Sequence, residues 1–188
     1  FPPTCVSVTP FTADDRAGHQ LRPLTRRSLG LTDDQVVLLF SGNPGAHKRV
    51  DLLPAAVRAL PESLRMRVAL LFVGDGPRRA ELEAQAGGGP AVPASFVGFQ
   101  SQRALSAFYH AADALVLPSH SETWGLVVNE ALHHGVPCVV SDRVGCVPDL
   151  IEEGRTGQVC AANSVPALAA AIQAVEPLVG RVSIRQIC

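Results

Sequence analysis

The stretch LPSHSETWGLVVNE, residues 117–130, joins the end of an apolar block to the start of a helix-length amphipathic segment. The apolar block covers residues 114–117 and ends at Pro118 and Ser119, which is typical of a strand covered on both faces. A buried strand followed directly by a helix is the repeating unit of a parallel sheet with crossover helices. The stretch therefore predicts an α/β fold.

Short apolar runs alternate with amphipathic stretches on both sides of this segment, from Val36 onward. The predicted strands cover residues 36–40, 67–73, 95–97, 114–117, 138–140 and 158–160, and the predicted helices cover 50–60, 78–86, 102–112, 125–134 and 165–175. This alternation predicts a Rossmann-like, doubly wound parallel sheet. We assign residues 26–175 to one domain, residues 1–25 to a lead-in or linker and residues 176–188 to a tail, because neither end shows a clear period.

The composition is that of an ordinary globular domain, with 188 residues, 47% hydrophobic and 18% charged. The net charge is −1 and the 16 basic residues are dispersed, which argues against a nucleic-acid or anionic-membrane partner. The 5 cysteines contain no C-x-x-C pair, so neither a disulfide framework nor a zinc site is expected and a reducing compartment fits best. No run approaches the roughly 18 apolar residues of a membrane-spanning helix.

A glycine and two apolar residues, Gly125, Leu126 and Val127, open the helix that follows the strand at residues 114–117. In open α/β sheets, ligands bind outside the carboxyl ends of the strands. A helix that begins there directs unpaired N–H groups and the positive end of its dipole at the ligand. Because Gly125 has no side chain, an anion can approach closely. These residues predict a seat for a diphosphate.

Two carboxylates are separated by seven intervening residues in this stretch, Glu122 just before the predicted helix and Glu130 inside it. A carboxylate can accept two hydroxyl hydrogen bonds at once, which a ribose or hexose diol offers. Two structural alternatives stay open for the segment alone. Ser119 and Glu122 also have the spacing of a helix capping box, and Glu130 could be a solvated helix residue.

Several short motifs follow in a set order around this stretch. They lie at residues 71–77, 96–99, 112–113, 118–119, 122, 125–127, 130–131, 135–137, 141–145, 149–151 and 154–157. Together they resemble the C-terminal, donor-nucleotide domain of the retaining, GT-B-type glycosyltransferases known as glycosyl transferases group 1, over residues 36–175. The resemblance implies that Glu122 contacts the donor sugar, that Glu130 contacts the ribose, and that the main-chain amides of residues 125–127 bind the phosphates.

The loop after the first predicted strand, residues 41–48, is similar to the glycine loop of that family. The resemblance implies that Gly42 and Asn43 border the donor and that Lys48 offsets the charge that grows on the departing diphosphate. We therefore expect Lys48 and Glu122 to be the catalytic residues. The family usually has Arg or Lys where this sequence has the uncharged Asn43. In the alternative interpretation, Lys48 and Arg49 only cap a surface helix.

Six further positions carry weaker expectations. Val97 follows a predicted strand at the place where the family cradles the nucleotide base, partly through main-chain groups. Trp124 is expected either to line the sugar pocket or to pack in the core. No second ligand stands at a metal-binding spacing from the pair at residues 133–134, so these histidines are expected at the surface or behind the site. Cys138 and Cys146 lie in apolar surroundings and are expected to be buried, inert thiols.

The function implied by the resemblance is hexosyl transfer from a nucleotide-diphosphate sugar to an unknown acceptor with retention, without metal or cofactor. UDP- or GDP-linked donors are favoured over ADP-linked ones. An N-terminal acceptor domain is missing from these 188 residues, so the chain is expected to bind donor without turnover. The expected location is the cytoplasm, with peripheral membrane attachment through the missing domain left open. The alternatives are a GT-B-fold epimerase or phosphorylase lobe, or a non-catalytic nucleotide-binding module.

Overall fold

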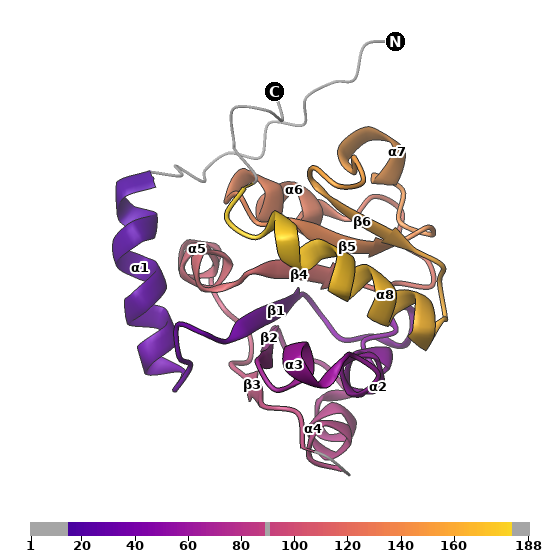
Figure 1. Cartoon of the computed structure of the whole chain (residues 1–188), viewed down its shortest axis with the longest axis horizontal. Coiled ribbons are helices and arrows are strands. Elements are labelled where there is room, and N and C mark those ends of the chain that lie inside the picture. The colour runs from indigo at the N-terminus through magenta and orange to yellow at the C-terminus, as the bar shows by residue number, and fades with distance from the viewer. Residues whose placement is uncertain (1–14, 89–90, 182–188) are drawn as a thin grey trace.

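The protein folds around one parallel sheet of 6 strands in the order β3-β2-β1-β4-β5-β6 (Figure 1). The computed structural model describes residues 15–88 and 91–181. The strands are β1 (Val36–Ser41), β2 (Val68–Val73), β3 (Ala94–Phe96), β4 (Ala114–Leu117), β5 (Cys138–Ser141) and β6 (Gly157–Cys160). Every neighbouring pair runs parallel. The predicted Rossmann-like, doubly wound fold is confirmed.

The helices are α1 (Asp15–Ser28), η1 (Ala46–Lys48), α2 (Leu52–Arg58), α3 (Glu62–Arg65), α4 (Arg79–Gly87), α5 (Gln102–Ala111), α6 (Leu126–His133), α7 (Val147–Leu150), α8 (Val165–Val175) and η2 (Glu176–Leu178). On one face of the sheet, α2 packs against α8, which also contacts β5 and β6. On the other, α5 contacts β1 and α6 contacts β4 and β5. Right-handed crossovers distribute the helices to the two faces in this way.

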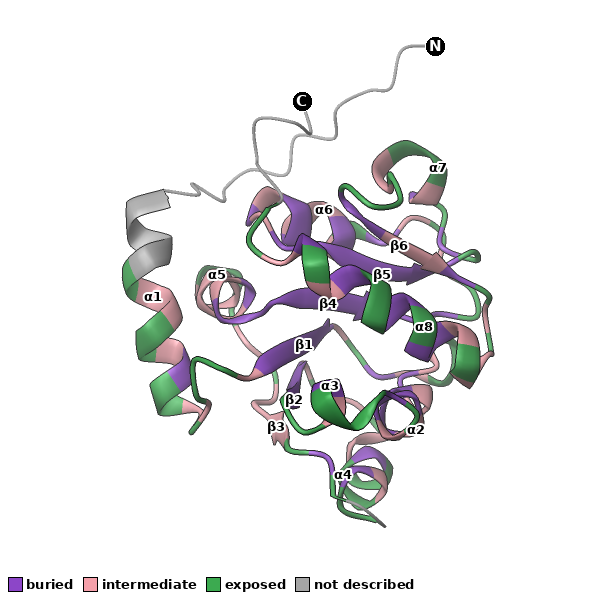
Figure 2. Cartoon of the chain, viewed as in Figure 1, coloured by how far each residue is buried: buried purple, intermediate pink, exposed green. Residues whose placement is uncertain are grey.

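The core lies in the middle of the sheet, where β1, β2, β4 and β5 are buried along their whole length (Figure 2). These are the strands with continuous apolar sequence. A parallel sheet needs such strands because helices cover both of its faces. The short outer strand β3 is half-buried, and it begins one residue before the predicted segment 95–97.

Helix α1 corrects the prediction at the N-terminal end. Residues 15–28 are helical and α1 packs against α5, so the predicted boundary between residues 25 and 26 falls inside a helix. Arg26 is 1% exposed and pairs with Asp113 at 2.5 Å, and Arg22 pairs with the other oxygen of Asp113 at 2.5 Å. The same carboxylate accepts a hydrogen bond of 2.7 Å from the Val37 amide. Polar contacts anchor α1, and such contacts leave no apolar period in the sequence.

Two other differences concern short elements. Helices α3 and α7 have 4 residues each and were not predicted, since so short a segment shows no period. The predicted helix at residues 50–60 is shorter, Leu52–Arg58, whereas α8 has the predicted bounds. Of the predicted lead-in and tail, residues 1–14 and 182–188 lie outside the described residues.

Candidate functional site

The strand order reverses between β1 and β4, which are neighbours in the sheet although β2 and β3 intervene in the sequence. The loops that follow β1 and β4 leave the same edge of the sheet, and the His120 amide joins them by donating a hydrogen bond of 2.7 Å to the His47 carbonyl. Ligands of open α/β sheets bind at such a reversal. The sheet thus brings the predicted loop at residues 41–48 beside the one that contains Glu122.

The two expected catalytic side chains contact each other across these loops. The Lys48 ammonium donates to a carboxylate oxygen of Glu122, and each side chain is 18% exposed. Lys48 ends the short helix η1, and Glu122 lies in the loop after β4. Lys48 therefore has a partner beyond its own helix, and its catalytic role stays a prediction. A cation and an anion meet at the reversal point of the sheet, within reach of water.

A chain of polar contacts that the sequence did not indicate surrounds this pair. Arg49 and Asn163 are the two non-glycine residues with positive φ among those described, at 48° and 59°, and their side chains hydrogen-bond to each other. Asn163 contacts His120 at 2.9 Å, and Arg49 pairs with Asp51 at 3.2 Å. Asp51 also pairs with Arg78 at 3.2 Å. These contacts join the loops after β1, β4 and β6 and direct Arg49 away from Glu122.

The N-terminus of α6 opens at Gly125, whose φ of 95° favours glycine. A Cβ atom at this position would lie 2.9 Å from Val144 Cγ1, so both backbone conformation and space require glycine. No side chain caps the helix, so its first amides, from Leu126 and Val127, are available to an anion. Leu126 is 53% exposed and Val127 is half-buried.

The capping-box alternative for Ser119 and Glu122 is wrong. Helix α6 begins at Leu126 with Gly125 as its N-cap, six residues after Ser119. The Ser119 side chain is fully buried, and its hydroxyl oxygen has no hydrogen-bond partner in the described part of the chain. Ser119 instead offers its carbonyl oxygen to the hydroxyl of Ser141, at the end of β5. Glu122 is consequently free to pair with Lys48.

Glu130 is not a solvated helix residue. It is half-buried in α6, and its Oε2 accepts a hydrogen bond of 2.7 Å from the hydroxyl of Tyr109, which lies in α5. Burial raises the pKa of Glu130 above its ordinary value, and the hydrogen bond from Tyr109 opposes this shift. The predicted ribose carboxylate is therefore held by a neighbouring helix.

His134 lies behind this carboxylate and is buried, at 8% exposure. Its ring stacks on Tyr109 with a centroid distance of 5.0 Å, and its nitrogens contact the Glu130 carbonyl at 2.7 Å and the Ser106 hydroxyl at 3.0 Å. Burial lowers the pKa of His134 to about 4. The imidazole is therefore neutral near pH 7 and acts as packing, as expected for a histidine behind the site.

The glycine loops after β1 and β2 pack directly on each other. A Cβ atom at Gly74 would overlap the Gly42 carbonyl, and one at Gly76 would overlap the Asn43 side chain. Asn43 itself is exposed. Gly42 and Asn43 therefore form the seam to the β2 loop, and their contact with a donor stays a prediction.

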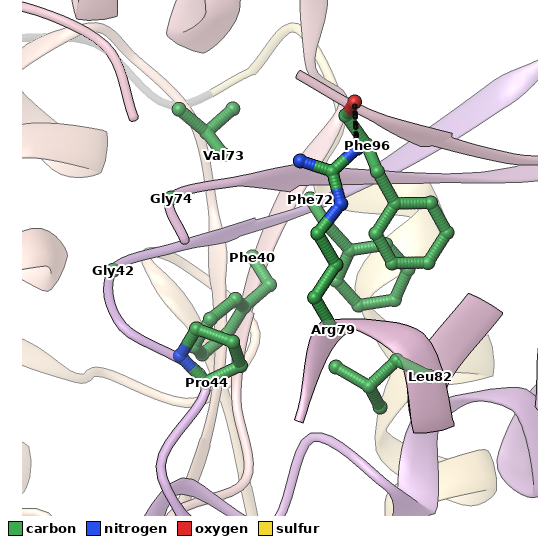
Figure 3. Close-up of a pocket in the computed structure, with 9 residues that line it drawn as sticks. All are labelled: Phe40, Gly42, Pro44, Phe72, Val73, Gly74, Arg79, Leu82 and Phe96. Atoms are coloured by element: carbon green, nitrogen blue, oxygen red, sulfur yellow. Dashed lines mark hydrogen bonds between the residues drawn. The ribbon is translucent and has the colours of Figure 1, made fainter. Parts of the chain in front are cut away.

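A small pocket lies under this seam, as Figure 3 shows. Phe72 and Phe96 stack at 4.5 Å along its wall, and the Arg79 guanidinium donates to the Phe96 carbonyl at 3.3 Å. Its volume of about 10 Å³ has room for about one water molecule. This pocket is too small for a nucleotide base.

Val97 lies just after β3, and its main-chain groups are already bonded within the protein. Its amide donates to the Phe72 carbonyl at 3.1 Å, and its carbonyl accepts from the Gln100 side chain at 2.8 Å. A carbonyl oxygen has a second lone pair, so it retains capacity for one more donor. The role of Val97 at a nucleotide base stays a prediction.

Trp124 is partly buried at the edge of the core, and the described cysteines lie within it. Trp124 packs against the hydrophobic core and donates from its indole to Asn129 at 3.0 Å. Cys138 and Cys146 are buried free thiols, as predicted, and so is Cys160. Burial raises the pKa of Cys146 to about 11, which keeps it protonated.

Within residues 15–88 and 91–181, no three His, Cys, Asp or Glu side chains gather as they would around a metal ion. No helix in that part of the chain has the length and apolar character to cross a membrane.

Comparison with known proteins gives a consistent family. The family described as glycosyl transferases group 1 matches residues 22–177. Over 179 residues, the chain is 36% identical to the D-inositol 3-phosphate glycosyltransferase of Actinosynnema mirum, covering 86% of this chain and 39% of that protein. Over 127 residues it is 41% identical to the sulfoquinovosyl transferase SQD2 of Arabidopsis thaliana, covering 66% of this chain and 23% of that protein.

The fold has a matching solved structure in WaaG, a glycosyltransferase involved in lipopolysaccharide biosynthesis. The TM-score is 0.73 at 29% identity, with 84% of this chain and 43% of WaaG covered. The chain thus spans less than half the length of these relatives. The likeness agrees with the Rossmann-like lobe of a GT-B architecture. Since the family match extends over most of the sequence, the chain belongs to the glycosyl transferases group 1 family.

Proposed function

We propose that this chain is the donor-binding lobe of a retaining glycosyltransferase and that it holds a nucleotide-diphosphate sugar at the reversal point between β1 and β4. One observation carries the proposal. The uncapped start of α6, the Lys48–Glu122 pair and the half-buried Glu130 all belong to the segments that directly follow β1 and β4, the two strands between which the strand order reverses. The first two supply positive charge and a sugar-facing carboxylate, and Glu130 supplies an acceptor for the ribose.

The diphosphate binds to the first amides of α6 and to Lys48. An ammonium has three donors, so Lys48 can retain Glu122 and still donate to a phosphate oxygen. As the bond between sugar and diphosphate breaks, negative charge grows on the phosphate, and a preorganised cation and helix dipole stabilise it. In this proposal Lys48 and the helix perform the role of a metal ion, and no cofactor is required.

Glu122 orients the donor sugar while it is paired with Lys48. When the donor binds, its sugar lies beside Glu122 and its diphosphate lies beside Lys48. The two charges neutralise each other in the free protein, where both are partly exposed. A bound phosphate can take over part of the charge balance of Lys48, because the ammonium has more than one donor.

The acceptor and the rest of the transfer machinery lie outside the proposed role of this chain, which spans 39% of its Actinosynnema mirum relative. In this proposal, UDP- or GDP-linked sugars are the donors, and the isolated chain binds them without turning them over. The parent protein is then cytoplasmic, with the acceptor domain N-terminal to this lobe.

Isothermal titration calorimetry with UDP, GDP and ADP tests the binding claim. One nucleotide should bind, and Lys48→Ala should abolish binding, since it removes the single lysine of the sequence. Glu130→Ala should weaken it. Arg27→Ala is the matched control, because Arg27 is exposed in the last turn of α1, away from the β1–β4 crevice. Repeating the titration with EDTA tests independence from metal. No heat with any of the three nucleotides would refute the proposal.

A non-catalytic nucleotide-binding module is the second candidate, and Asn43 favours it. The exposed amide of Asn43 carries no charge where the family usually has a base. In a full-length parent protein, Asn43→Arg should raise donor hydrolysis if leaving-group charge is what limits the reaction. A parent protein without transfer or hydrolysis activity in either form would favour the binding module.

A further inference from the structure

Tyr109 is the single tyrosine of the sequence, and its side chain is fully buried between α5 and α6. Its hydroxyl donates a hydrogen bond of 2.7 Å to Oε2 of Glu130, 21 residues further along the chain. An ionised carboxylate only accepts hydrogen bonds, so the direction of this bond is set. The contact fixes which oxygen of Glu130 faces the protein.

The other carboxylate oxygen, Oε1 of Glu130, has no hydrogen-bond partner among the described residues. Glu130 is half-buried, so this oxygen is neither sealed in the core nor fully surrounded by water. A polar atom in such surroundings gains most from a directed donor. The arrangement leaves one acceptor of Glu130 for a ligand and reserves the other for Tyr109.

The phenol ring is itself held in place. It stacks on His134 with ring planes 19° apart, and His134 contacts the Glu130 carbonyl and the Ser106 hydroxyl. Burial raises the pKa of Tyr109 well above its ordinary value, against an opposing contact with the Ser41 side chain at the end of β1. The phenol therefore stays protonated and remains a hydrogen-bond donor. Stacking on His134 and complete burial restrain the ring beside Glu130.

We infer that Tyr109 is a positioning residue that directs Oε1 of Glu130 at a ribose hydroxyl and so makes the site selective for ribonucleotides over deoxyribonucleotides. This inference rests on the proposed function, which gives Glu130 the ribose. The physical basis is general: a site built to hydrogen-bond a ligand hydroxyl rejects the analogue that lacks it, because the partner is then left unpaired. The rejection requires a carboxylate that cannot turn to another partner, and Tyr109 supplies that restraint.

The test measures calorimetric affinities of the full 188-residue chain. The ligands are whichever of UDP, GDP and ADP binds, and its 2′-deoxy and 3′-deoxy forms. The wild type should bind the ribonucleotide about tenfold more tightly than at least one deoxy form, the value of a hydrogen bond to a charged group. Tyr109→Phe keeps the stacked ring and removes the hydroxyl. This variant should bring the ratio of ribonucleotide to deoxynucleotide affinity close to one, because only the affinity for the ribonucleotide should fall.

Ser106→Ala is the matched control. Ser106 lies on α5, as Tyr109 does. Its substitution removes the hydroxyl that contacts His134 and leaves the hydrogen bond between Tyr109 and Glu130 intact. Its ratio of ribonucleotide to deoxynucleotide affinity should equal that of the wild type. If the role of Tyr109 were purely structural, Tyr109→Phe would lower the affinity for the ribonucleotide and the deoxynucleotides equally, and that result would overturn the inference.

The outcomes separate the two proposals. Absence of binding by the wild type contradicts the proposed function. Binding without ribose discrimination, or with the same discrimination in Tyr109→Phe, leaves nucleotide binding standing and overturns the role of Tyr109. Should Tyr109→Phe fail to fold, a carbon-13 label on the phenol gives a single NMR resonance in the wild type. The ribonucleotide should shift it, and Glu130→Gln should abolish the shift. A resonance that no ribonucleotide moves would count against the inference.

Discussion

The two sides of the crevice are built differently. On the side that the proposed function gives to the phosphates, here called the phosphate side, Lys48 and Glu122 come from the segments after β1 and β4, and each is 18% exposed. On the side that the proposed function gives to the ribose, here called the ribose side, Glu130 and Tyr109 come from α6 and α5, and the buried His134 stacks on Tyr109. The phosphate side is adaptable, whereas the ribose side is preorganised. The difference suits a donor whose diphosphate changes charge during the reaction while its ribose does not.

The largest expected effect comes from Gly125, the N-cap of α6, whose backbone conformation is fixed although it lies on the phosphate side. Gly125→Ala places a Cβ atom 2.9 Å from Val144 in a residue with φ of 95°. Strain and overlap together should lower the free energy of unfolding by about 4 kcal/mol, and nucleotide binding should be lost. Chemical denaturation and calorimetry measure both. Gly87→Ala, in α4, meets nothing within 4 Å and should be neutral or stabilising. A stable Gly125→Ala variant that still binds would show that the start of α6 is also adaptable.

The next effect tests how rigid the ribose side is. The pKa of His134 falls from 6.5 to about 4 on folding, so the unfolded chain binds more protons between these values. Stability should therefore be lost as the pH falls from about 7 to 4, by about 3 kcal/mol from this group. In His134→Gln the dependence of the unfolding free energy on pH should be flatter over that range. Denaturation at pH 4, 5, 6 and 7 measures it. Equal slopes in both proteins would mean that His134 is accessible to protons in the folded state.

A smaller effect is expected where the adaptable side lacks a charge. Asn43 is exposed on the loop after β1, so Asn43→Arg can add a donor to the phosphates without disturbing the core. Nucleotide affinity should rise about tenfold, the value of a charge-assisted hydrogen bond. Calorimetry at low and high salt checks this, because the gain should shrink with ionic strength. Asn43→Gln is the uncharged control. An unchanged affinity would mean that Asn43 does not face the diphosphate.

The smallest effect concerns the support of Lys48. Asn163→Ala removes the side chain that joins Arg49 to His120, between the loops after β6, β1 and β4. We expect nucleotide affinity to fall about threefold while the unfolding free energy changes by less than about 1 kcal/mol, since the contacts are exposed. Glu152→Ala, which breaks an exposed pair with Arg155 elsewhere, is the control. A larger loss of affinity would make the phosphate side more preorganised than we infer.

Sequence alone determined the sheet and most of its helices. Continuous apolar blocks such as residues 36–40 are typical of strands buried on both faces, and their alternation with amphipathic segments predicts parallel pairing. The carboxylates and glycines of the site were visible for a related reason. Glu122, Gly125 and Glu130 lie within one strand-to-helix segment, and such local spacing survives in the sequence.

Tertiary structure alone decided which side chains those groups contact. Helix α1 depends on Arg22 and Arg26 meeting Asp113, about 90 residues away, and so shows no local period. The pairing of Lys48 with Glu122 and of Tyr109 with Glu130 likewise joins segments that are 74 and 21 residues apart. A hydrogen bond depends on the distance and direction between two groups, and only packing of the helices on the sheet sets these. The sequence therefore specifies the groups of the crevice, and the packed sheet makes one side adaptable and the other rigid.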